Sequence, residues 1–396
     1  MNSRLPTYLK HGLLTVAISV AVAGCSGQSF PGSQLLGGQQ NAYVPPKIKA
    51  LKPVTASVKT LWQVKTASSV SSVRIHPYVN DVAVYTAAGG TVSAWNKTTG
   101  RALWSNPVGE LISAGINGGE GKVYVGTRNG KALALDANTG KILWIAPLGT
   151  EVLAVSPSSN GNLAFRTIDG KLVGLDSNTG EQAWVRQQRT PQLSSYGASV
   201  PIIVDNGVIA GFDNGKIAAY LLKTGKPIWE VTIATPQGGS ELDQIVDVDG
   251  RLKPLGNALF TSSVNGRILG ANMLNGNVVW SDVLSSYTGA DADPKGVYST
   301  DSTGRIWKYG PLNGQKAWDN SDLENRQPTA PTVVAGGSRI VVGDRQGNLH
   351  WLDTSNGQIV SRTTGDPAGY QVPVAVSGNT IYAFGRSGML TAISNQ

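Results

Sequence analysis

The chain has 396 residues, of which 40% are hydrophobic, 15% are charged and 49 are glycine. This hydrophobic fraction allows an extensive core and excludes disorder over most of the chain. The single cysteine, Cys25, excludes an intramolecular disulfide and a cysteine-based zinc site, and three scattered histidines offer no metal cluster. The net charge of +8 comes without a run of lysine and arginine, so it gives little support to a nucleic-acid partner.

Residues 1–24 have the layout of a cleaved signal peptide. After a basic start, an apolar run of 11 residues extends from Leu13 to Ala23, much shorter than the ~20 that a membrane-spanning helix needs. Small residues lead to Cys25, and this ending resembles the signal of bacterial lipoproteins, which is cut before a cysteine that is then acylated. The resemblance implies a lipid anchor on Cys25, and Ser26 in place of aspartate implies the outer membrane. The alternative is an ordinary signal peptide with a chance cysteine.

Residues 25–57 are rich in glycine, serine, glutamine and proline, which is typical of flexible linkers. We therefore predict that they form a tether between the lipid on Cys25 and a folded body at 58–396.

A repeat begins at residue 82. In its second copy, Gly130 is followed ten residues later by Gly140 and four residues after that by Trp144. A further copy, with Gly347 and Gly357, has Ser361 at the tryptophan position. The full spacing recurs at Gly90/Gly100/Trp104, Gly170/Gly180/Trp184, Gly215/Gly225/Trp229, Gly266/Gly276/Trp280 and Gly304/Gly314/Trp318.

Each copy predicts short strands joined by tight turns. Alternating segments such as Val123 to Val125 end at Asn-Gly or Asp-Gly pairs, in which we expect glycine to take a positive φ. These pairs are Asn129-Gly130, Asp169-Gly170, Asn214-Gly215 and Asn265-Gly266. A third strand carries the tryptophan, and a fourth lies in the variable stretch before the next copy. Four antiparallel strands in ~40 residues are typical of a propeller blade.

The two ends of the repeat array complement each other. An eighth copy begins at Ile381 but ends at Gln396, before its tryptophan strand, whereas Trp62 stands upstream of the first copy without a glycine pair. We therefore predict an all-β fold, an eight-bladed β-propeller of four-stranded antiparallel blades, with the last blade closed by an N-terminal strand. Closure removes the free edges that invite aggregation.

The regular tryptophans are predicted to pack between blades. Small residues stand six positions before the second glycine, and we expect them to leave room for the indole of a neighbouring blade. They are Ala94, Ala134, Gly174, Ala219 and Gly270. A platform for stacking carbohydrate is the functional alternative. The predicted docking residues are Trp62, Trp104, Trp144, Trp184, Trp229, Trp280 and Trp318.

The segment from Ala134 to Trp144, Ala-x-Asp-x-x-Thr-Gly-Lys-x-x-Trp, resembles the tryptophan-docking repeat of quinoprotein (PQQ-type) propellers. Within that group, the length, the lipoprotein signal and the eight short blades are similar to the BamB family of outer-membrane protein assembly factors. This resemblance covers essentially the whole mature chain. It implies a non-catalytic, lipid-anchored scaffold of the BAM complex, without cofactor or metal, that binds the periplasmic (POTRA) domains of BamA. Such a scaffold would assist the delivery, folding and insertion of outer-membrane proteins, with unfolded clients as further partners.

Two irregular stretches are similar to family segments that contact BamA. Residues 193–201 match Leu-x-Leu-Arg-Gly-x-Ser-x-Pro, except that serine replaces the second leucine and tyrosine replaces the arginine. The second stretch follows the fourth copy and contains Asp247 and Asp249. By resemblance, the residues that bind BamA are Leu193, Ser195, Tyr196, Gly197, Asp247 and Asp249. Taken alone, the residues around 247–250 also fit an acidic hairpin turn, and they lack the spaced oxygens and downstream glutamate of a calcium loop.

Two other function classes share some of these features. Quinoprotein dehydrogenases have the same repeat, but they resemble one another in greater length and in a catalytic aspartate beside calcium, often with adjacent cysteines. His76 and His350 lack flanking catalytic motifs, so we expect them to be structural and the chain not to be an enzyme. The positive charge weakly permits a propeller that binds peptidoglycan or another envelope component.

Overall fold

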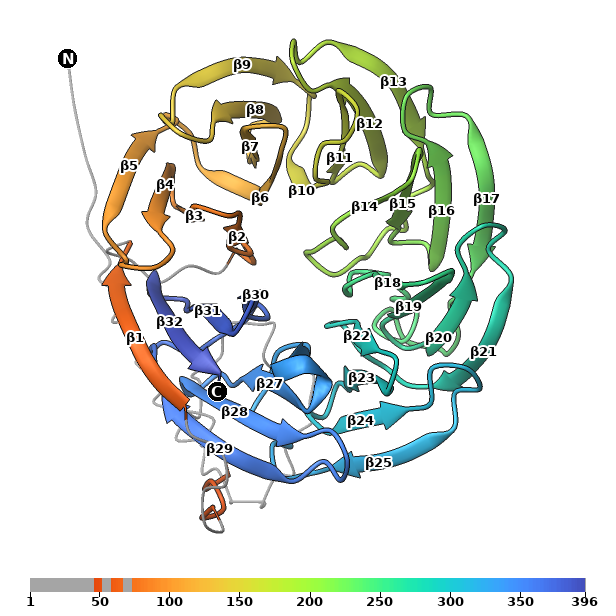
Figure 1. Ribbon diagram of the computed structural model, residues 1–396. Coiled ribbons are helices and arrows are strands. Elements are labelled where there is room, and N and C mark those ends of the chain that lie inside the picture. The colour runs from red at the N-terminus through yellow and green to blue at the C-terminus, as the bar shows by residue number, and fades with distance from the viewer. Residues whose placement is uncertain (1–45, 52–57, 67–72, 396) are drawn as a thin grey trace, which may run out of the picture. The chain divides into compact units, whose positions relative to one another are not determined.

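The computed structural model describes residues 46–51, 58–66 and 73–395, and within these ranges it contains eight four-stranded antiparallel sheets and no α-helix. The sheets are arranged around a common centre as blades (Figure 1). The predicted fold class and number of blades are confirmed. The predicted signal peptide and Cys25 lie outside the described residues. In the described ranges, no helix has the length and apolar character needed to cross a membrane.

Strands that follow one another in the chain pair within each blade, with the first strand innermost and the fourth at the rim (Figure 1). Blade 1 contains β2 (Tyr78–Val79), β3 (Ala83–Ala88), β4 (Thr91–Asn96) and β5 (Ala102–Pro107). Blade 2 contains β6 (Ile112–Gly119), β7 (Lys122–Thr127), β8 (Lys131–Asp136) and β9 (Ile142–Pro147). Blade 3 contains β10 (Val152–Val155), β11 (Asn162–Thr167), β12 (Lys171–Asp176) and β13 (Gln182–Gln187). Blade 4 contains β14 (Ile202–Val204), β15 (Gly207–Gly211), β16 (Lys216–Leu221) and β17 (Pro227–Thr232).

The second half of the ring continues the same order. Blade 5 contains β18 (Lys253–Leu255), β19 (Ala258–Ser262), β20 (Arg267–Asn272) and β21 (Val278–Val283). Blade 6 contains β22 (Ala290–Asp293), β23 (Gly296–Thr300), β24 (Ile306–Tyr309) and β25 (Lys316–Asn320). Blade 7 contains β26 (Thr332–Val334), β27 (Arg339–Gly343), β28 (Asn348–Asp353) and β29 (Ile359–Thr364), with a 3-10 turn, η2 (Ala335–Gly337), between its first two strands. Blade 8 contains β30 (Ala375–Ser377), β31 (Thr380–Phe384), β32 (Met389–Asn395) and β1 (Val58–Lys65).

Blade 8 joins the two ends of the ring. Its outer strand β1 pairs antiparallel with β32, with Trp62 opposite Ala392 and Lys65 opposite Met389. The predicted closure by an N-terminal strand is therefore confirmed. Because β32 is paired on both sides, neither of its edges is exposed to another chain.

The turns between second and third strands follow the prediction with one correction. Gly130, Gly170 and Gly215 have φ values of 78°, 83° and 75°, as expected for these turns. In the fourth pair it is Asn265 that takes the positive φ, 44°, whereas Gly266 does not. A Cβ on Gly266 would lie 2.1 Å from Ser263 Oγ, so glycine is required there for space rather than for φ.

The regular indoles join each blade to the next. Trp144 of blade 2 donates its Nε1 hydrogen to the carbonyl oxygen of Ser177 in blade 3 at 3.0 Å. Its ring lies against Gly180, where an added Cβ would be 2.7 Å from Trp144 Cε3. The same bond to a carbonyl of the following blade is made by Trp62, Trp104, Trp184, Trp229, Trp280 and Trp318.

The small residues on the third strands have a different role from the one expected. They face the tryptophan of their own blade, not that of a neighbour: Ala134 pairs with Trp144. A Cβ on Gly174 would lie 2.1 Å from Cε2 of Trp184, its cross-strand partner. Room for the neighbouring indole comes instead from the second glycine of each repeat, such as Gly180.

In blade 7 the tryptophan stands on the third strand and the small residue on the fourth, the reverse of the other blades described above. Trp351 on β28 is fully buried and faces Ser361 on β29. In blade 8 the third strand, β32, and the fourth strand, β1, come from opposite ends of the chain. No third-to-fourth turn therefore exists to accept an indole from position 361, which explains why the seventh copy departs from the repeat.

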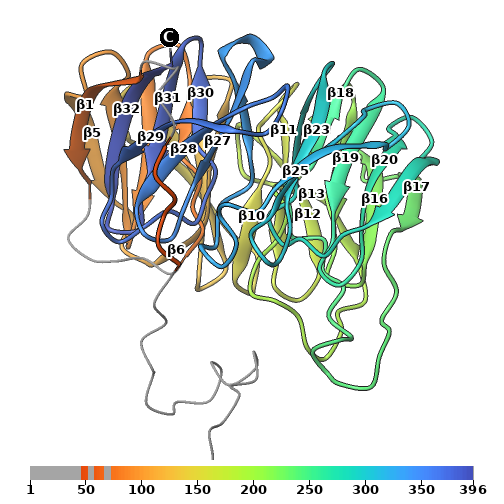
Figure 2. The ribbon, with the colours of Figure 1, turned by 90° about the horizontal axis from the view of Figure 1, so that it is seen from below.

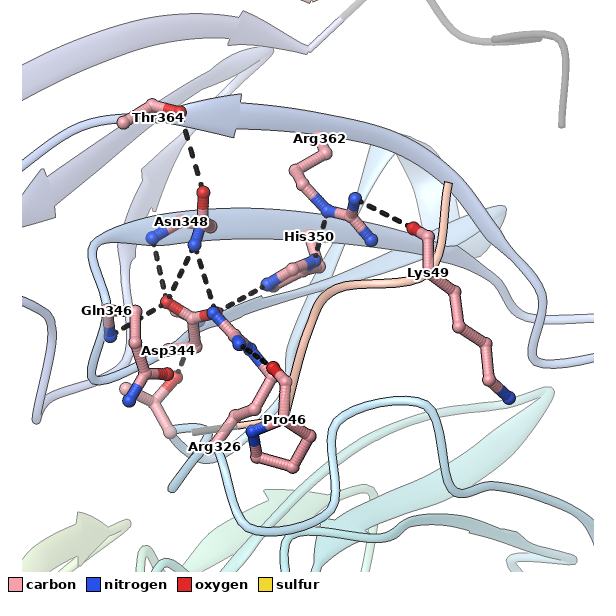
Figure 3. A network of polar contacts seen from close by, with 11 residues as sticks. Pro46, Lys49, Arg326, Asp344, Gln346, Asn348, His350, Arg362 and Thr364 are labelled. Carbon is pink, nitrogen blue, oxygen red and sulfur yellow. Dashed lines mark hydrogen bonds and ion pairs between the residues drawn. The ribbon is translucent and has the colours of Figure 1, made fainter. Parts of the chain in front are cut away.

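Residues 46–51 belong to the predicted tether, yet they contact blade 7 and the connection that leads to it from blade 6 (Figure 3). The Pro46 carbonyl oxygen accepts a hydrogen bond from Arg326 Nη1 at 2.7 Å, and that of Lys49 accepts one from Arg362 Nη1 at 3.1 Å. The Lys49 ammonium group pairs with Asp322. The linker-like composition of this segment predicted no such contacts.

Candidate functional site

The two irregular stretches are the connections that enter and leave blade 4. Residues 188–201 join β13 to β14, and residues 233–252 join β17 to β18. In an antiparallel blade, such connections lie on the same side as the turns between second and third strands. We call this side the loop face. Figure 2 shows that the green loops beside β16 and β17 project beyond the other connections.

The predicted site residues of the two connections meet at Ser195. Its backbone nitrogen and its hydroxyl both hydrogen-bond to Asp247 Oδ2, the hydroxyl at 2.8 Å, and the hydroxyl also contacts Asp249 Oδ2. Gly197 allows this close approach, since a Cβ there would lie 2.8 Å from Asp249 Oδ2. The structure therefore brings Ser195, Gly197, Asp247 and Asp249 together, with Asp247 buried and the other three partly exposed.

Burial shapes the chemistry of the two carboxyl groups. Burial raises the pKa of Asp247 to about 6 and that of Asp249 to about 7, while Ser195 opposes both shifts. One hydroxyl has one proton, so Ser195 Oγ cannot donate to two carboxylates at once. A proton held by the aspartate pair resolves this conflict, because a protonated carboxyl can donate to Ser195 Oγ.

A buried ion pair lies beside the carboxyl pair. Arg166 on β11 is fully buried and donates from Nη2 to Asp213 Oδ1 at 2.8 Å, with its guanidinium carbon 4.5 Å from the Phe212 ring centroid. Burial is the largest cause of the raised pKa values of Asp247 and Asp249. The neighbouring Asp213 carboxylate raises both pKa values further, whereas Arg166 lowers them. Sequence reasoning missed Arg166 and Asp213, because no motif marks them and only the ring brings blades 3, 4 and 5 together here.

Asp247 was expected among the residues that contact a partner, but its side chain is fully buried. It can act on a partner only through the loop that it holds. The side chains that the network presents to solvent are Leu193, 42% exposed, and Tyr196, 49% exposed. These two are the most exposed of the six predicted site residues.

Tyr196 stands where the resembled family has arginine, and it is anchored on another blade connection. Its hydroxyl donates to Glu151 Oε1 at 2.5 Å, and Arg128 Nε lies 3.3 Å from the same oxygen. Burial and the hydrogen bond to Glu151 raise the pKa of Tyr196, which keeps the phenol protonated as the donor. Glu151 precedes β10 and Arg128 follows β7, so sequence distance concealed both partners.

His350 belongs to a separate buried network in blade 7 (Figure 3). Its Nδ1 accepts a hydrogen bond from Arg362 Nε at 3.0 Å, which leaves Nε2 to donate to Asp344 Oδ2 at 3.1 Å. Burial opposes ionisation of Asp344, but hydrogen bonds from His350 and Asn348 and the Arg326 partner hold its pKa at about 2. The same Arg326 and Arg362 hold residues 46–51, so these contacts of His350 are structural.

His76 lies apart from that network, on the wall of the central cavity. Burial, with the positive charges of Arg251 and Arg74, lowers its pKa to about 3. It is therefore neutral at physiological pH. Within the described ranges, histidine, cysteine and acidic side chains form no group of three or more that could hold a metal ion.

Comparison with known proteins gives one consistent family. The profile of a family described as outer membrane protein assembly factor BamB matches residues 88–320 and 308–396. Outer membrane protein assembly factor BamB of Pseudomonas aeruginosa is 40% identical over 386 residues, covering 97% of this chain and 98% of the relative. BamB of Escherichia coli K12 is 33% identical over 336 residues, covering 81% of this chain and 85% of the relative.

Solved structures show the same relationship. The crystal structure of BamB from Moraxella catarrhalis superposes with a TM-score of 0.78 at 27% identity, over 85% of this chain and 100% of the other. Quinohemoprotein alcohol dehydrogenase from Comamonas testosteroni superposes over 86% of this chain and 77% of the enzyme, with a TM-score of 0.66 at 14% identity. At that identity, the likeness to the dehydrogenase concerns the fold alone.

Proposed function

Because this chain belongs to the BamB family of outer membrane protein assembly factors, we propose that it is a lipid-anchored scaffold that binds the periplasmic domains of BamA through its loop face. The role in outer-membrane protein assembly follows from the family, which is non-catalytic. The proposal adds the partner, the anchor on Cys25, the periplasmic orientation and the residues in contact.

The observation that carries this proposal is the way Leu193 and Tyr196 are presented. Both are large, exposed side chains, and the loop that bears them is fixed by the partly buried hydrogen bonds of Ser195 to two aspartates. A fixed loop loses little conformational freedom on binding, so more of its contact energy appears as affinity. Aromatic and apolar anchors of this kind often carry most of the energy of an interface.

The proposal extends to unfolded outer-membrane clients. Each blade has an outer strand that pairs on one side only, and β21 exposes Val279 (64%) and Val283 (80%). An extended client segment can add to such an edge through backbone hydrogen bonds, with its apolar side chains against the exposed ones.

The decisive variant is Leu193→Ala combined with Tyr196→Ala. We expect at least about a tenfold loss of affinity for the purified periplasmic domains of BamA, because two anchors are removed. The melting temperature should stay close to that of the wild type, since both side chains are substantially exposed. The measurement is calorimetric titration with circular dichroism melting on the same samples.

A matched control is Leu312→Ala, which removes an 85% exposed leucine from the turn between β24 and β25 on the opposite face. Its affinity should equal that of the wild type. Wild-type affinity in the Leu193/Tyr196 variant would refute the loop face as the contact surface.

A further inference from the structure

A cavity of about 310 Å³ lies at the centre of the ring. Its walls come from the innermost strand, or the residues just before it, of all eight blades. Tyr196 and Gly197, in the connection between β13 and β14, form part of its wall. A polypeptide held on the loop face therefore lies next to the entrance of this cavity.

Beside the cavity lie three guanidinium groups that have no carboxylate partner in the described part of the chain. Arg74 lines the cavity, and its guanidinium carbon lies 5.2 Å from the ring centroid of Tyr287, another wall residue. Arg345 Nη1 donates to Oε1 of the wall residue Gln371 at 3.5 Å. Arg386 donates to a backbone carbonyl, and its Nε is buried without a hydrogen-bond partner in the described part of the chain.

Arg74 is exposed and Arg345 and Arg386 are partly exposed, and the three differ from the buried arginines Arg166 and Arg326, which pair with aspartates. Among the described residues, no carboxylate oxygen lies within 4.0 Å of a side-chain nitrogen of Arg74, Arg345 or Arg386. By contrast, Arg251 on the same wall pairs with Asp291 at 3.3 Å.

The repulsion among these guanidinium groups affects the pKa of Arg345. Burial and the charges of Arg386 and Arg74 lower the pKa of Arg345, although Tyr287 opposes the shift. Like charges held together in a partly desolvated place repel, so a bound anion would be stabilised there. The neutral His76 leaves this positive charge to the guanidinium groups.

The rest of the wall favours a peptide over an isolated anion. Each innermost strand is the end strand of its sheet, so its second edge faces the centre. A few groups of this edge bond to the next blade, as the Ile116 N–H does to the His76 carbonyl oxygen. Apolar side chains such as Ile116, Leu153 and Leu252 line the space between these edges. Backbone groups beside apolar side chains match an extended polypeptide.

We propose that the entrance of the central cavity binds an extended peptide segment bearing carboxylate groups, supplied by a polypeptide docked on the loop face. The carboxylates contact Arg74 and Arg345, and the peptide backbone lies along the innermost strands. This inference rests on the proposed function, because the docked polypeptide supplies the segment.

The test uses the soluble propeller and a fluorescent peptide of alternating valine and glutamate. The variant Arg74→Gln/Arg345→Gln should bind this peptide at least about tenfold more weakly than the wild type does. The control Arg101→Gln/Lys141→Gln makes the same change in net charge in the exposed third-to-fourth turns of the opposite face, and it should bind as the wild type does. If both variants bind the peptide equally weakly, the loss of affinity comes from net charge alone and the proposal is overturned.

Further arms define the ligand class and exclude misfolding. A peptide of alternating valine and glutamine should bind weakly to every variant. Displacement of the acidic peptide by inorganic phosphate at lower concentration than by glutamate would overturn the proposal in favour of a phosphate-bearing ligand. If the double variant melts at a lower temperature than the wild type, the single variant Arg74→Gln is used in its place for the peptide-binding comparison. Its side chain is exposed, so we expect this substitution to leave the melting temperature unchanged.

A parallel arm separates this inference from the proposed function. Leu193→Asp alters a residue outside the cavity wall, so it should weaken BamA binding and leave peptide binding unchanged. If Leu193→Asp loses BamA while the arginine variant still binds the peptide, the scaffold function stands and the cavity proposal falls. If Leu193→Asp keeps BamA, the proposed function itself falls.

Discussion

At the scale of the residue, the docking tryptophans and the glycines beneath them form matched pairs. Each indole needs a neighbour without a Cβ in the next blade, and that glycine also takes a positive φ, 77° at Gly180. The glycine therefore answers two requirements at once, space and backbone conformation. This double demand explains why its spacing to the tryptophan is so regular in the sequence.

The pairing can be measured with a double-mutant cycle. Trp144→Ala should lower the free energy of unfolding by about 3–5 kcal/mol, as expected for a buried tryptophan. Gly180→Ala should also destabilise, because its Cβ overlaps the indole and φ is positive. In the double variant the overlap disappears, so the combined loss should fall short of the sum by about 0.5–3 kcal/mol. Urea unfolding of the four proteins gives the result.

The control for this cycle is Trp144→Ala combined with Gly276→Ala, which packs on Trp229 in another blade. That combination should be additive. Additive losses for Trp144 and Gly180 as well would contradict direct packing of the indole on the glycine.

The aspartate pair gives a prediction on pH. The folded-state pKa values of Asp247 and Asp249, about 6 and about 7, are above the usual value near 3.8. A raised pKa means that the folded state binds the proton more tightly than the unfolded state. The contribution of the pair to stability is therefore fully present below about pH 4 and is lost as the pH rises through 6 to 7.

The variant Asp247→Asn/Asp249→Asn removes this titration while it retains the shape of both side chains. The melting temperature of the wild type, relative to that of the variant, should fall between pH 4 and pH 7.5. Taking the difference cancels the groups shared by both proteins, such as Asp344, whose pKa is lowered to about 2. A difference that stays constant over this range would show that the pair holds no proton in the folded protein.

At the scale of the element, the closing strand β1 is the piece on which the ring depends. It covers the edge of β32 from Val58 to Lys65, and Trp62 docks on blade 1 through the carbonyl of Lys97 at 3.1 Å. Both interactions come from one strand, so blade 8 and its junction to blade 1 depend on it together.

Truncation separates the strand from the segment before it. A chain that begins at Val73 lacks β1, and we expect a lower melting temperature and concentration-dependent association, because the edge of β32 is exposed. A chain that begins at Val58 keeps β1 and loses the contacts of residues 46–51 with Asp322, Arg326 and Arg362, so it should remain monomeric. Sedimentation velocity compares the two, and a monomeric, equally stable Val73 chain would contradict closure by β1.

The elements also show how far the sequence alone could lead. The glycine and tryptophan spacing defines strand, turn and blade number, because each blade satisfies its requirements locally. The burial of Asp247, the anchor of Tyr196 on Glu151 and the buried Arg166 depend on contacts between blades, which no local pattern records. The reversal at Trp351 and Ser361 becomes understandable only after the two chain ends are found in one sheet.

At the scale of the whole molecule, the residues that join the blades and the exposed residues of the candidate site lie in different places. The docking indoles lie toward the rim and join the blades, whereas the exposed site residues lie on connections at the loop face. Substitution at the rim should therefore affect melting, and substitution on the loop face should affect binding. Tyr196 and Arg74 line the same central cavity, so the loop that bears Leu193 and Tyr196 lies beside the proposed peptide site.

The central claim is that the loop face contacts BamA, and site-specific photo-crosslinking in intact cells tests it most directly. A photoreactive amino acid at position 193 should crosslink to BamA, and the same group at position 312 on the opposite face should not. Crosslinking to BamA from position 312, with none from position 193, would contradict the account.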